Sequence, residues 1–225
     1  MSCWLENKCK KLHCNDENGC LIKFKLDYLY DAAYISEDQR KYITLHTDED
    51  GTDFEEFKRL KNIQDNIVDF VNKGSQLYLH SNNSGNGKTS WALRLVQAYL
   101  ASTWLTSPLE CKVLYINLPT FFNAFKETFT ANPGKDAVDY VQHILNNYKK
   151  CDIIIWDDVA TKQFSKFEGD ELLGLLDGRA KKCNIFTSNL KDSELHQAIG
   201  DRLYSRIANG SINIELHGSD KRGLY

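Results

Sequence analysis

The sequence predicts an α/β domain with three layers, in which a parallel sheet of five strands lies between two layers of helices. Short apolar runs alternate with longer segments whose apolar residues recur at three- and four-residue steps. This alternation is typical of parallel strands joined by crossover helices. The first run also leads into a glycine-rich turn and the third ends in two adjacent aspartates. Both features are typical of α/β domains that bind ligands at the carboxyl edge of the sheet.

Length and composition favour one globular unit with a small appendage. The chain has 225 residues, of which 42% are hydrophobic, and a formal net charge of −3. This charge gives no overall attraction to nucleic acid, so such binding would need a local patch. No apolar run approaches the length of a membrane span, and the N-terminus has no signal-peptide core. The seven cysteines are therefore expected as thiols or metal ligands in a reducing cytosol.

The glycine-rich turn is a P-loop candidate. It lies between a strand at 77–79 and a helix that begins near residue 90, which is the context that a phosphate-binding loop needs. Gly85 and Gly87 let backbone N–H groups approach phosphate oxygens, while Lys88 would reach the β- and γ-phosphates and Thr89 would hold Mg²⁺. Asn82 replaces the first glycine of the pattern, and we expect it to adopt a positive φ. The expected nucleotide-binding residues are Asn82, Asn83, Ser84, Gly85, Asn86, Gly87, Lys88, Thr89 and Ser90.

The apolar run at 152–158 is a Walker B candidate, because it ends in two acids at the carboxyl end of a buried strand. We expect Asp157 to hold the Mg²⁺ shared with Thr89. Asp158 would orient or deprotonate the attacking water, a position at which glutamate is more usual. The shorter side chain predicts slow hydrolysis without affecting nucleotide binding.

The remaining elements follow from periodicity. Helices are predicted loosely at 23–34, then as one amphipathic segment at 53–71 that ends at Gly74, and at 121–129, 136–148 and 168–180. Strands are predicted at 112–117, 183–187 and 211–216, and 48–53 is expected to be an acidic boundary loop. Asn189 follows a strand and is a candidate to contact the γ-phosphate or the attacking water, the alternative being a helix N-cap or a turn residue. Arg202 and Arg206 lie on one helix face; without a local carboxylate partner, such an arginine is a candidate finger for a neighbour's nucleotide.

The N-terminal region is rich in cysteine. Cys3, Cys9, Cys14 and Cys20 could close a tetrahedral Zn²⁺ site, although the spacing lacks a C-x₂-C pair. The alternatives are free thiols in a flexible tail or a cluster used only in contact with a partner. Nearby lysines could serve nucleic acid or form a solvated face. The other three cysteines, Cys111, Cys151 and Cys183, are expected to be buried thiols.

Taken together, these motifs resemble the AAA+ helicase loaders of the DnaC/DnaI type, including phage-encoded versions. The resemblance covers residues 45–225 and includes Phe-Thr-Ser-Asn-Leu at 186–190, Asp-Arg-Leu-Tyr-Ser-Arg at 201–206 and Gly-Ser-Asp-Lys-Arg-Gly at 218–223. It implies a RecA-like AAA+ ATPase domain at 45–225 without a C-terminal helical lid. It also implies a helicase-contact region at 1–44, similar to the zinc-binding domain of DnaI-type loaders.

The resemblance further implies ATP as the nucleotide, with the replicative hexameric helicase and single-stranded DNA as partners and self-association through the ATPase domain. It makes Asn189 the sensor 1 residue and Arg206 the finger that acts in trans, with Arg202 beside it at the subunit interface. The expected location is the cytoplasm of a bacterium, or of the host of a phage.

Three other functions remain open from the sequence. One is an adaptor that uses ATP to hold a shape and hardly hydrolyses it, which Asp158 favours. Another is the helper ATPase of a transposition system, which shares these motifs, although the cysteine-rich N-terminus favours a loader. The last is a small-molecule kinase, for which the sequence shows no acceptor pocket and no lid arginine cluster.

Overall fold

The computed structural model describes residues 20–41, 45–48, 50–160 and 163–221. Its sheet has five parallel strands in the order β2-β3-β4-β1-β5, so that β1 lies between β4 and β5. The strands are β1 (Gln76–His80), β2 (Val113–Asn117), β3 (Ile153–Asp157), β4 (Cys183–Ser188) and β5 (Ser211–Glu215).

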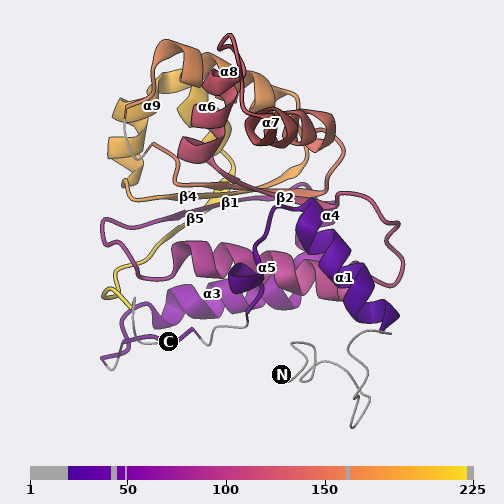
Figure 1. Ribbon diagram of the computed structural model, residues 1–225. Coiled ribbons are helices and arrows are strands. Elements are labelled where there is room, and N and C mark those ends of the chain that lie inside the picture. Colours follow the sequence, from indigo (N-terminus) through magenta and orange to yellow (C-terminus); the bar gives the residue numbers. More distant parts are fainter. Residues whose placement is uncertain (1–19, 42–44, 49, 161–162, 222–225) are drawn as a thin grey trace.

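Helices cover both faces of the sheet (Figure 1). One layer holds α1 (Leu21–Ala32), α2 (Glu37–Arg40), α3 (Phe54–Asp65), α4 (Ile67–Asn72) and α5 (Lys88–Thr103). The other holds α6 (Leu118–Glu127), α7 (Lys135–Asn147), α8 (Lys166–Asp177) and α9 (Asp192–Ile207). The predicted three-layer α/β fold with a five-stranded parallel sheet is therefore confirmed.

The strands carry apolar residues toward both layers, because successive side chains point to opposite faces of a sheet. On β3, Ile153 and Ile155 pack with the α5 layer, whereas Ile154 and Trp156 pack with the α6 layer. Asp157 continues the first of these two rows. Its carboxylate is therefore directed to the face on which α5 begins.

One predicted helix is divided in two. The segment expected as a single helix at 53–71 breaks at Asn66, whose backbone (φ −114°, ψ 28°) is not helical. The Asn66 side chain donates a hydrogen bond to the Asn62 carbonyl at 2.9 Å, where it competes with the helical pattern. The predicted end at Gly74 is confirmed, since this residue has a φ of 64° and donates to the Val71 carbonyl at 2.9 Å.

The N-terminal helix α1 belongs to the main core. Leu26, Leu29 and Ile35 are almost fully buried against the α5 layer. Beyond α1, the Ala33 carbonyl accepts a hydrogen bond from the Tyr115 N–H at 2.9 Å, on the open edge of β2. The expected boundary between 1–44 and 45–225 remains a prediction.

Candidate nucleotide-binding site

The P-loop lies between β1 and α5, as its spacing predicts. Gly85 (φ 75°) and Gly87 (φ 100°) both have left-handed backbone, and α5 begins directly at Lys88. Gly87 offers no side chain to cap the helix, so the first N–H groups of α5 are available to an anion. The expected positive φ of Asn82 is wrong, because this exposed residue is not among those with left-handed backbone. The two later glycines make the turn instead.

Lys88 is held inside its own loop. Its side chain is buried, and Nζ donates to the Asn83 carbonyl at 2.8 Å and to Asn86 Oδ1 at 3.2 Å. Asn86 is itself fixed, since its amide donates to Ser81 Oγ at 2.6 Å. These polar contacts hold an ammonium group at the mouth of the turn. The two serines of the predicted set differ in exposure: Ser84 is exposed and Ser90 is half-buried.

The structure brings Thr89 and Asp157 together. Asp157 is 3% exposed, and its Oδ1 accepts hydrogen bonds from Thr89 Oγ1 at 2.8 Å and from Thr187 Oγ1 at 2.7 Å. Its Oδ2 accepts one from the Tyr115 hydroxyl at 2.7 Å. Burial and the neighbouring Asp157 charge raise the pKa of Tyr115, so this hydroxyl stays protonated and donates. A buried carboxylate is thus surrounded by hydroxyl donors from three elements.

Asp158 has an unusual backbone. Its φ is 59°, a left-handed value that aspartate tolerates better than most residues. The turn is fixed by the Asp158 N–H, which donates to Thr187 Oγ1 at 3.1 Å. Asp158 Oδ2 accepts a hydrogen bond from the Asn117 amide at 3.0 Å. Asn117, at the end of β2, therefore holds the carboxylate that is expected to act on water.

Thr89 and Asp157 fit a magnesium ion. Hydroxyl and carboxylate oxygens are its preferred ligands, and phosphate oxygens and water usually complete its octahedral shell. Among the described residues, no group of three or more His, Cys, Asp or Glu side chains could hold a metal by itself. Mg²⁺ would supply charge neutralisation at the phosphates, and this chain would contribute Thr89 directly and Asp157 beside it.

Three polar residues of this site were not predicted: Tyr115, Asn117 and Thr187. Tyr115 and Asn117 lie on β2 and Thr187 lies on β4, and both of these strands pair with β3. The signal was present in the sequence, because polar residues late in a buried strand are candidates for the ligand edge of the sheet. Which of them reaches Asp157 depends on the pairing of β2 and β4 with β3.

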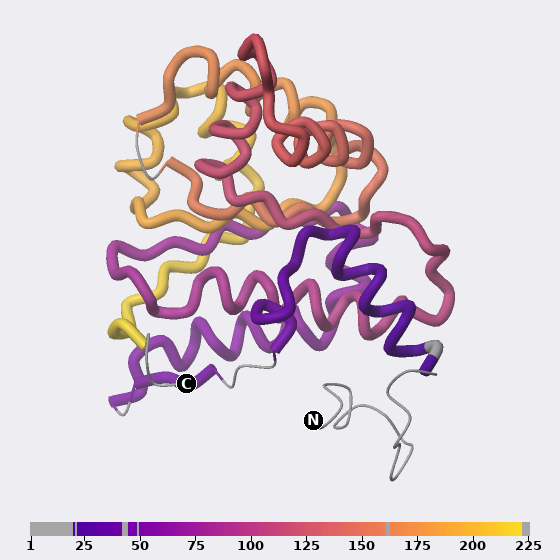
Figure 2. The backbone as a smooth tube through the Cα atoms, viewed as in Figure 1, coloured from indigo at the N-terminus to yellow at the C-terminus, as the bar shows by residue number. Residues whose placement is uncertain are grey.

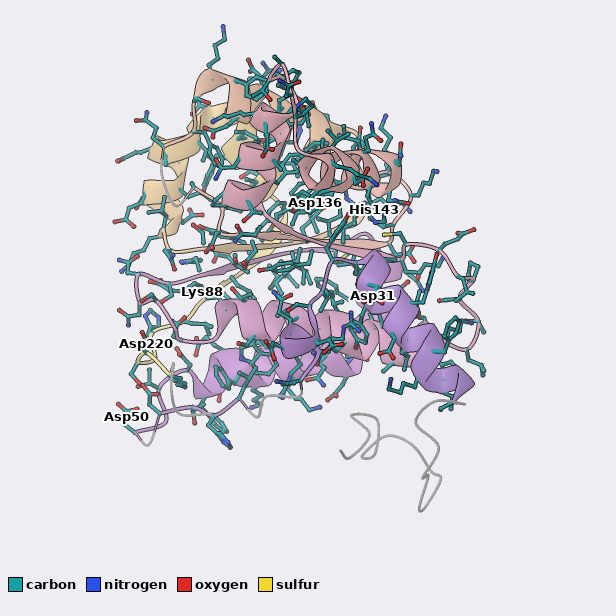
Figure 3. The ribbon with its side chains drawn as sticks, viewed as in Figure 1. Asp31, Asp50, Lys88, Asp136, His143 and Asp220 are labelled. Atoms are coloured by element: carbon teal, nitrogen blue, oxygen red, sulfur yellow. The ribbon has the colours of Figure 1, made fainter. Side chains whose placement is uncertain are left out.

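A C-terminal segment borders the P-loop. The backbone N–H groups of His217 and Gly218 both donate to the Asp53 carboxylate at 2.7 Å, and the Lys221 N–H donates to the Gly85 carbonyl at 3.0 Å. Gly85 has a φ of 75°, and a Cβ placed on it would lie 1.8 Å from Asp220 Oδ1, so another residue would be strained there and would displace the Asp220 side chain. Figure 2 shows this yellow segment beside the start of α3, and Figure 3 places Lys88 and Asp220 at the same end of the molecule. Asp48 and Asp53 therefore both bind the C-terminal segment, since the Ser219 N–H also donates to Asp48 Oδ2 at 2.9 Å.

Asn189 lies one residue beyond β4. The pairing of His80 with Ser188 places it beside the start of the P-loop, where its side chain is partly exposed. The alternative role as a helix N-cap is not supported, because α9 has Lys191 at that position.

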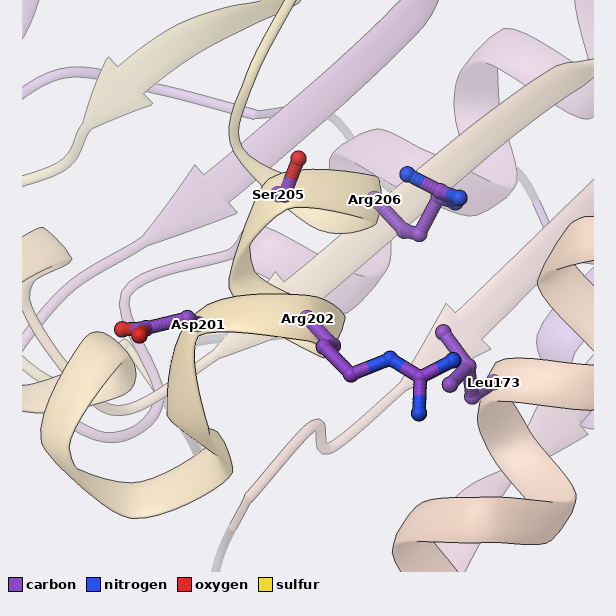
Figure 4. A pocket seen from close by; sticks show the side chains of 5 residues that line it. All are labelled: Leu173, Asp201, Arg202, Ser205 and Arg206. Atoms are coloured by element: carbon purple, nitrogen blue, oxygen red, sulfur yellow. The ribbon is translucent and has the colours of Figure 1, made fainter.

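Arg202 and Arg206 lie on α9, in the helix layer opposite α5. They line a pocket of about 250 Å³ together with Leu173, Asp201 and Ser205, and the Arg202 side chain extends toward Leu173 (Figure 4). Arg206 has a local carboxylate partner, since its Nε lies 2.6 Å from Asp177 Oδ1. The sequence did not reveal this pair, because Asp177 lies on a different helix. Within the described part of the chain, no ion pair involves Arg202.

The cysteines divide into two groups. Cys3, Cys9 and Cys14 lie outside the described residues, so the predicted zinc site remains a prediction; Cys20 is a half-buried free thiol. Cys151 and Cys183 are buried, whereas Cys111 is only partly buried. Burial raises the pKa of these thiols to about 12 for Cys111, about 11 for Cys151 and about 12 for Cys183, which makes them unreactive.

Comparison with known proteins gives structural matches only. No protein-family profile matches the sequence, and no curated protein is similar to it. A putative primosome component from Streptococcus pyogenes has a TM-score of 0.59 and 19% identity, over 87% of this chain and 98% of that chain. The DnaC helicase loader has a TM-score of 0.54 and 16% identity, over 72% of this chain and 88% of that chain. DnaI has a TM-score of 0.55 and 20% identity, over 86% of this chain and 93% of that chain.

The same fold occurs in a replication initiator. AMPPCP-bound DnaA from Aquifex aeolicus has a TM-score of 0.54 and 20% identity, over 82% of this chain but only 51% of that chain. At these identities the matches establish the fold. The resemblance to DnaC/DnaI-type loaders that the motifs predict is confirmed in that sense, and this chain has a fold similar to that of DnaC, DnaI and DnaA.

Proposed function

We propose that this chain is an ATP-binding AAA+ protein that engages the replicative hexameric helicase and loads it onto single-stranded DNA, with slow Mg²⁺-dependent hydrolysis. The observation that carries the nucleotide part is the 2.8 Å contact between Thr89 and Asp157 beside the buried Lys88. A hydroxyl, a carboxylate and an ammonium group meet there at the start of a helix, which is the arrangement that a magnesium nucleotide needs.

The loader part rests on the fold and on the motifs. The DnaC, DnaI and primosome structures have a similar fold, and the segments at 186–190, 201–206 and 218–223 resemble those of DnaC/DnaI-type loaders. Residues 45–225 would be the ATPase domain and residues 1–44 the helicase-contact region, with Zn²⁺ on the N-terminal cysteines. Across the described part of the chain, no helix is long and apolar enough to cross a lipid bilayer. A cytoplasmic location is part of this proposal.

The site residues would have distinct roles. Residues 82–90 would bind the phosphates, Asp157 would orient the magnesium shell, Asp158 would act on water and Asn189 would sense the γ-phosphate. Arg206 and Arg202 would act on the nucleotide of a second copy, because α9 lies in the helix layer opposite α5 and no P-loop residue lines their pocket. Self-association is therefore required for hydrolysis.

A specific observation also favours the adaptor with little hydrolysis. The Asp158 carboxylate is one methylene shorter than glutamate, and Asn117 holds it by a 3.0 Å hydrogen bond. In this second candidate function the protein binds ATP and the helicase but turns over very slowly. A turnover assay with purified helicase separates it from the loader.

The test is capture of bound proteins from bacterial lysate on the tagged chain, with and without Mg-ATP. Recovery of the replicative helicase in an ATP-dependent amount is expected, and recovery of a transposase or of DNA alone would contradict the loader function. Lys88→Ala should remove the ATP dependence and reduce nucleotide affinity by about 10- to 100-fold, since a hydrogen bond to a charged group contributes about 1.5 to 3 kcal/mol. Lys61→Ala, on the exposed face of α3, is the matched control. An unchanged ATP-dependent melting shift in Lys88→Ala would refute the P-loop assignment.

A further inference from the structure

The Asp157 carboxylate is held unequally at its two oxygens. Oδ1 accepts from two threonine hydroxyls, Thr89 at 2.8 Å and Thr187 at 2.7 Å. At Oδ2 the short contact is the Tyr115 hydroxyl at 2.7 Å, while the Asn117 amide lies at 3.5 Å and bonds better to Asp158. In the described part of the site, Tyr115 is therefore the main donor that fixes the second oxygen.

This arrangement matters once a metal engages Thr89. If Thr89 Oγ1 bound the metal, its hydroxyl hydrogen could still be donated to Asp157 Oδ1, so Oδ1 would keep both threonine donors and Tyr115 would remain the close donor to Oδ2. Two donors on opposite oxygens fix the plane of a carboxylate, whereas a donor on one oxygen leaves rotation about χ2, which is a soft torsion. Partners of this kind set the affinity of a metal site by orienting its ligands.

Tyr115 is itself fixed from the N-terminal side. It lies on β2, the edge strand against which α1 packs (Figure 1). Its N–H donates to the Ala33 carbonyl at 2.9 Å. The segment that contains Ala33 is held in turn, because the Gln97 amide on α5 donates to the backbone carbonyl of Gln39 at 3.0 Å. The segment that follows α1 thus fixes the backbone of Tyr115.

We propose that Tyr115 is a positioning residue for Asp157, held in place by the segment 33–40, and that it determines how tightly the site binds a divalent metal with its nucleotide. This inference rests on the proposed nucleotide-binding function. It assigns to the tyrosine hydroxyl no contact with the nucleotide itself. The effect of removing it should therefore appear in the metal dependence of binding and not in metal-free binding.

The experiment is a titration of Mg²⁺ against the affinity for a fluorescent ATP analogue, in wild type and in Tyr115→Phe. The variant removes one hydroxyl and keeps the ring. We expect the Mg²⁺ concentration for half-maximal enhancement to rise about tenfold, the lower end of what loss of a ligand-orienting partner costs. Affinity in EDTA should change less than about twofold, since the Tyr115 hydroxyl is assigned no contact with the nucleotide.

The matched control is Tyr99→Phe. Tyr99 is also a largely buried tyrosine, and its hydroxyl donates to an aspartate at the same kind of distance, Asp152 Oδ2 at 2.8 Å, away from the P-loop. This control should leave the Mg²⁺ titration unchanged. A wild-type titration in Tyr115→Phe overturns the inference, and so does an equal shift in Tyr99→Phe, which would indicate a general loss of packing. A wild-type protein that binds no magnesium nucleotide would instead refute the proposed function and the inference with it.

Discussion

Two buried polar side chains lie at opposite ends of the central strands, Arg179 at the amino ends and Asp157 at the carboxyl ends. Both are almost inaccessible, with 1% and 3% of their surface exposed. Both also have several hydrogen-bond partners, as buried polar groups require. The two residues differ in what those partners are.

The partners of Arg179 are mostly backbone atoms. Its guanidinium donates to the carbonyls of Tyr148, Cys151 and Cys183, and to the Asn184 side chain at 3.0 Å. Burial lowers the pKa of Arg179. These carbonyls belong to the loop before β3 and the start of β4, so they cannot turn to another donor. Arg179 therefore links the amino ends of β3 and β4 by hydrogen bonds, which is a structural role.

The partners of Asp157 are side-chain hydroxyls, which rotate. Thr89, Thr187 and Tyr115 each donate in this structure, and each hydroxyl can accept a hydrogen bond or bind a metal instead. A buried charge whose partners are fixed stabilises the fold. A buried charge whose partners can rotate, at the carboxyl edge of the sheet, can exchange these partners for a ligand. The predictions below test this difference, from the largest expected effect on the free energy of unfolding to the smallest.

Arg179→Met should lower the free energy of unfolding by about 3 to 5 kcal/mol, because it leaves several buried carbonyls without a donor. Chemical denaturation measures this, and Arg59→Met on the exposed surface of α3 is the control, with a change below about 0.5 kcal/mol. Nucleotide affinity of the folded fraction should be unchanged. A loss below about 1 kcal/mol would show that Arg179 is not a structural residue of the strand ends.

Glu168→Gln tests a buried carboxylate that lies away from the P-loop. Burial alone would raise the pKa of Glu168. The hydrogen bonds from Lys126 and Ser165 and the positive charge of Lys126 outweigh burial and lower this pKa to about 2. Because the folded pKa lies below the unfolded value, the stabilisation is present above about pH 5 and is lost as the pH falls toward 2. The free energy of unfolding of the wild type should exceed that of Glu168→Gln by about 2 to 3 kcal/mol at pH 7 and by much less at pH 3. A difference independent of pH would contradict the ionised pair.

Asp157→Asn should change the free energy of unfolding by less than about 1 kcal/mol, since the surrounding hydroxyls can turn to donate to and accept from an amide. Magnesium should no longer increase nucleotide affinity in this variant. Melting temperatures with and without nucleotide and Mg²⁺ measure both effects. Destabilisation as large as that of Arg179→Met would remove the distinction between the two ends of the sheet.

Arg206→Ala should have the smallest effect on stability. Its ion pair with Asp177 is about half-exposed, and such pairs contribute about 0 to 1 kcal/mol. Nucleotide binding should stay normal while hydrolysis is lost, because the arginine is proposed to act on a second copy. Asp177→Asn, which removes the partner and keeps Arg206, should retain hydrolysis. Wild-type turnover in Arg206→Ala would exclude Arg206 as a finger.

Much of the site was predictable from the sequence, because motifs fix local chemistry. A strand, a glycine-rich turn and Gly-Lys-Thr specify a phosphate loop through backbone preference alone, and an apolar run that ends in Asp157 specifies an acid at a strand end. Local patterns also located the five strands to within one or two residues. The break at Asn66 was missed because one side chain competes there with helical periodicity that continues on both sides.

The sequence by itself therefore determined the α/β class, the P-loop and the pair of acids, since each depends on neighbouring residues. Only the tertiary structure decided which hydroxyls surround Asp157, that Asp53 binds the backbone after β5, and that Arg206 meets Asp177. These contacts join residues from 29 to 165 positions apart. They depend on the order and register of parallel strands and on how helices cover them, which arise from packing the whole core.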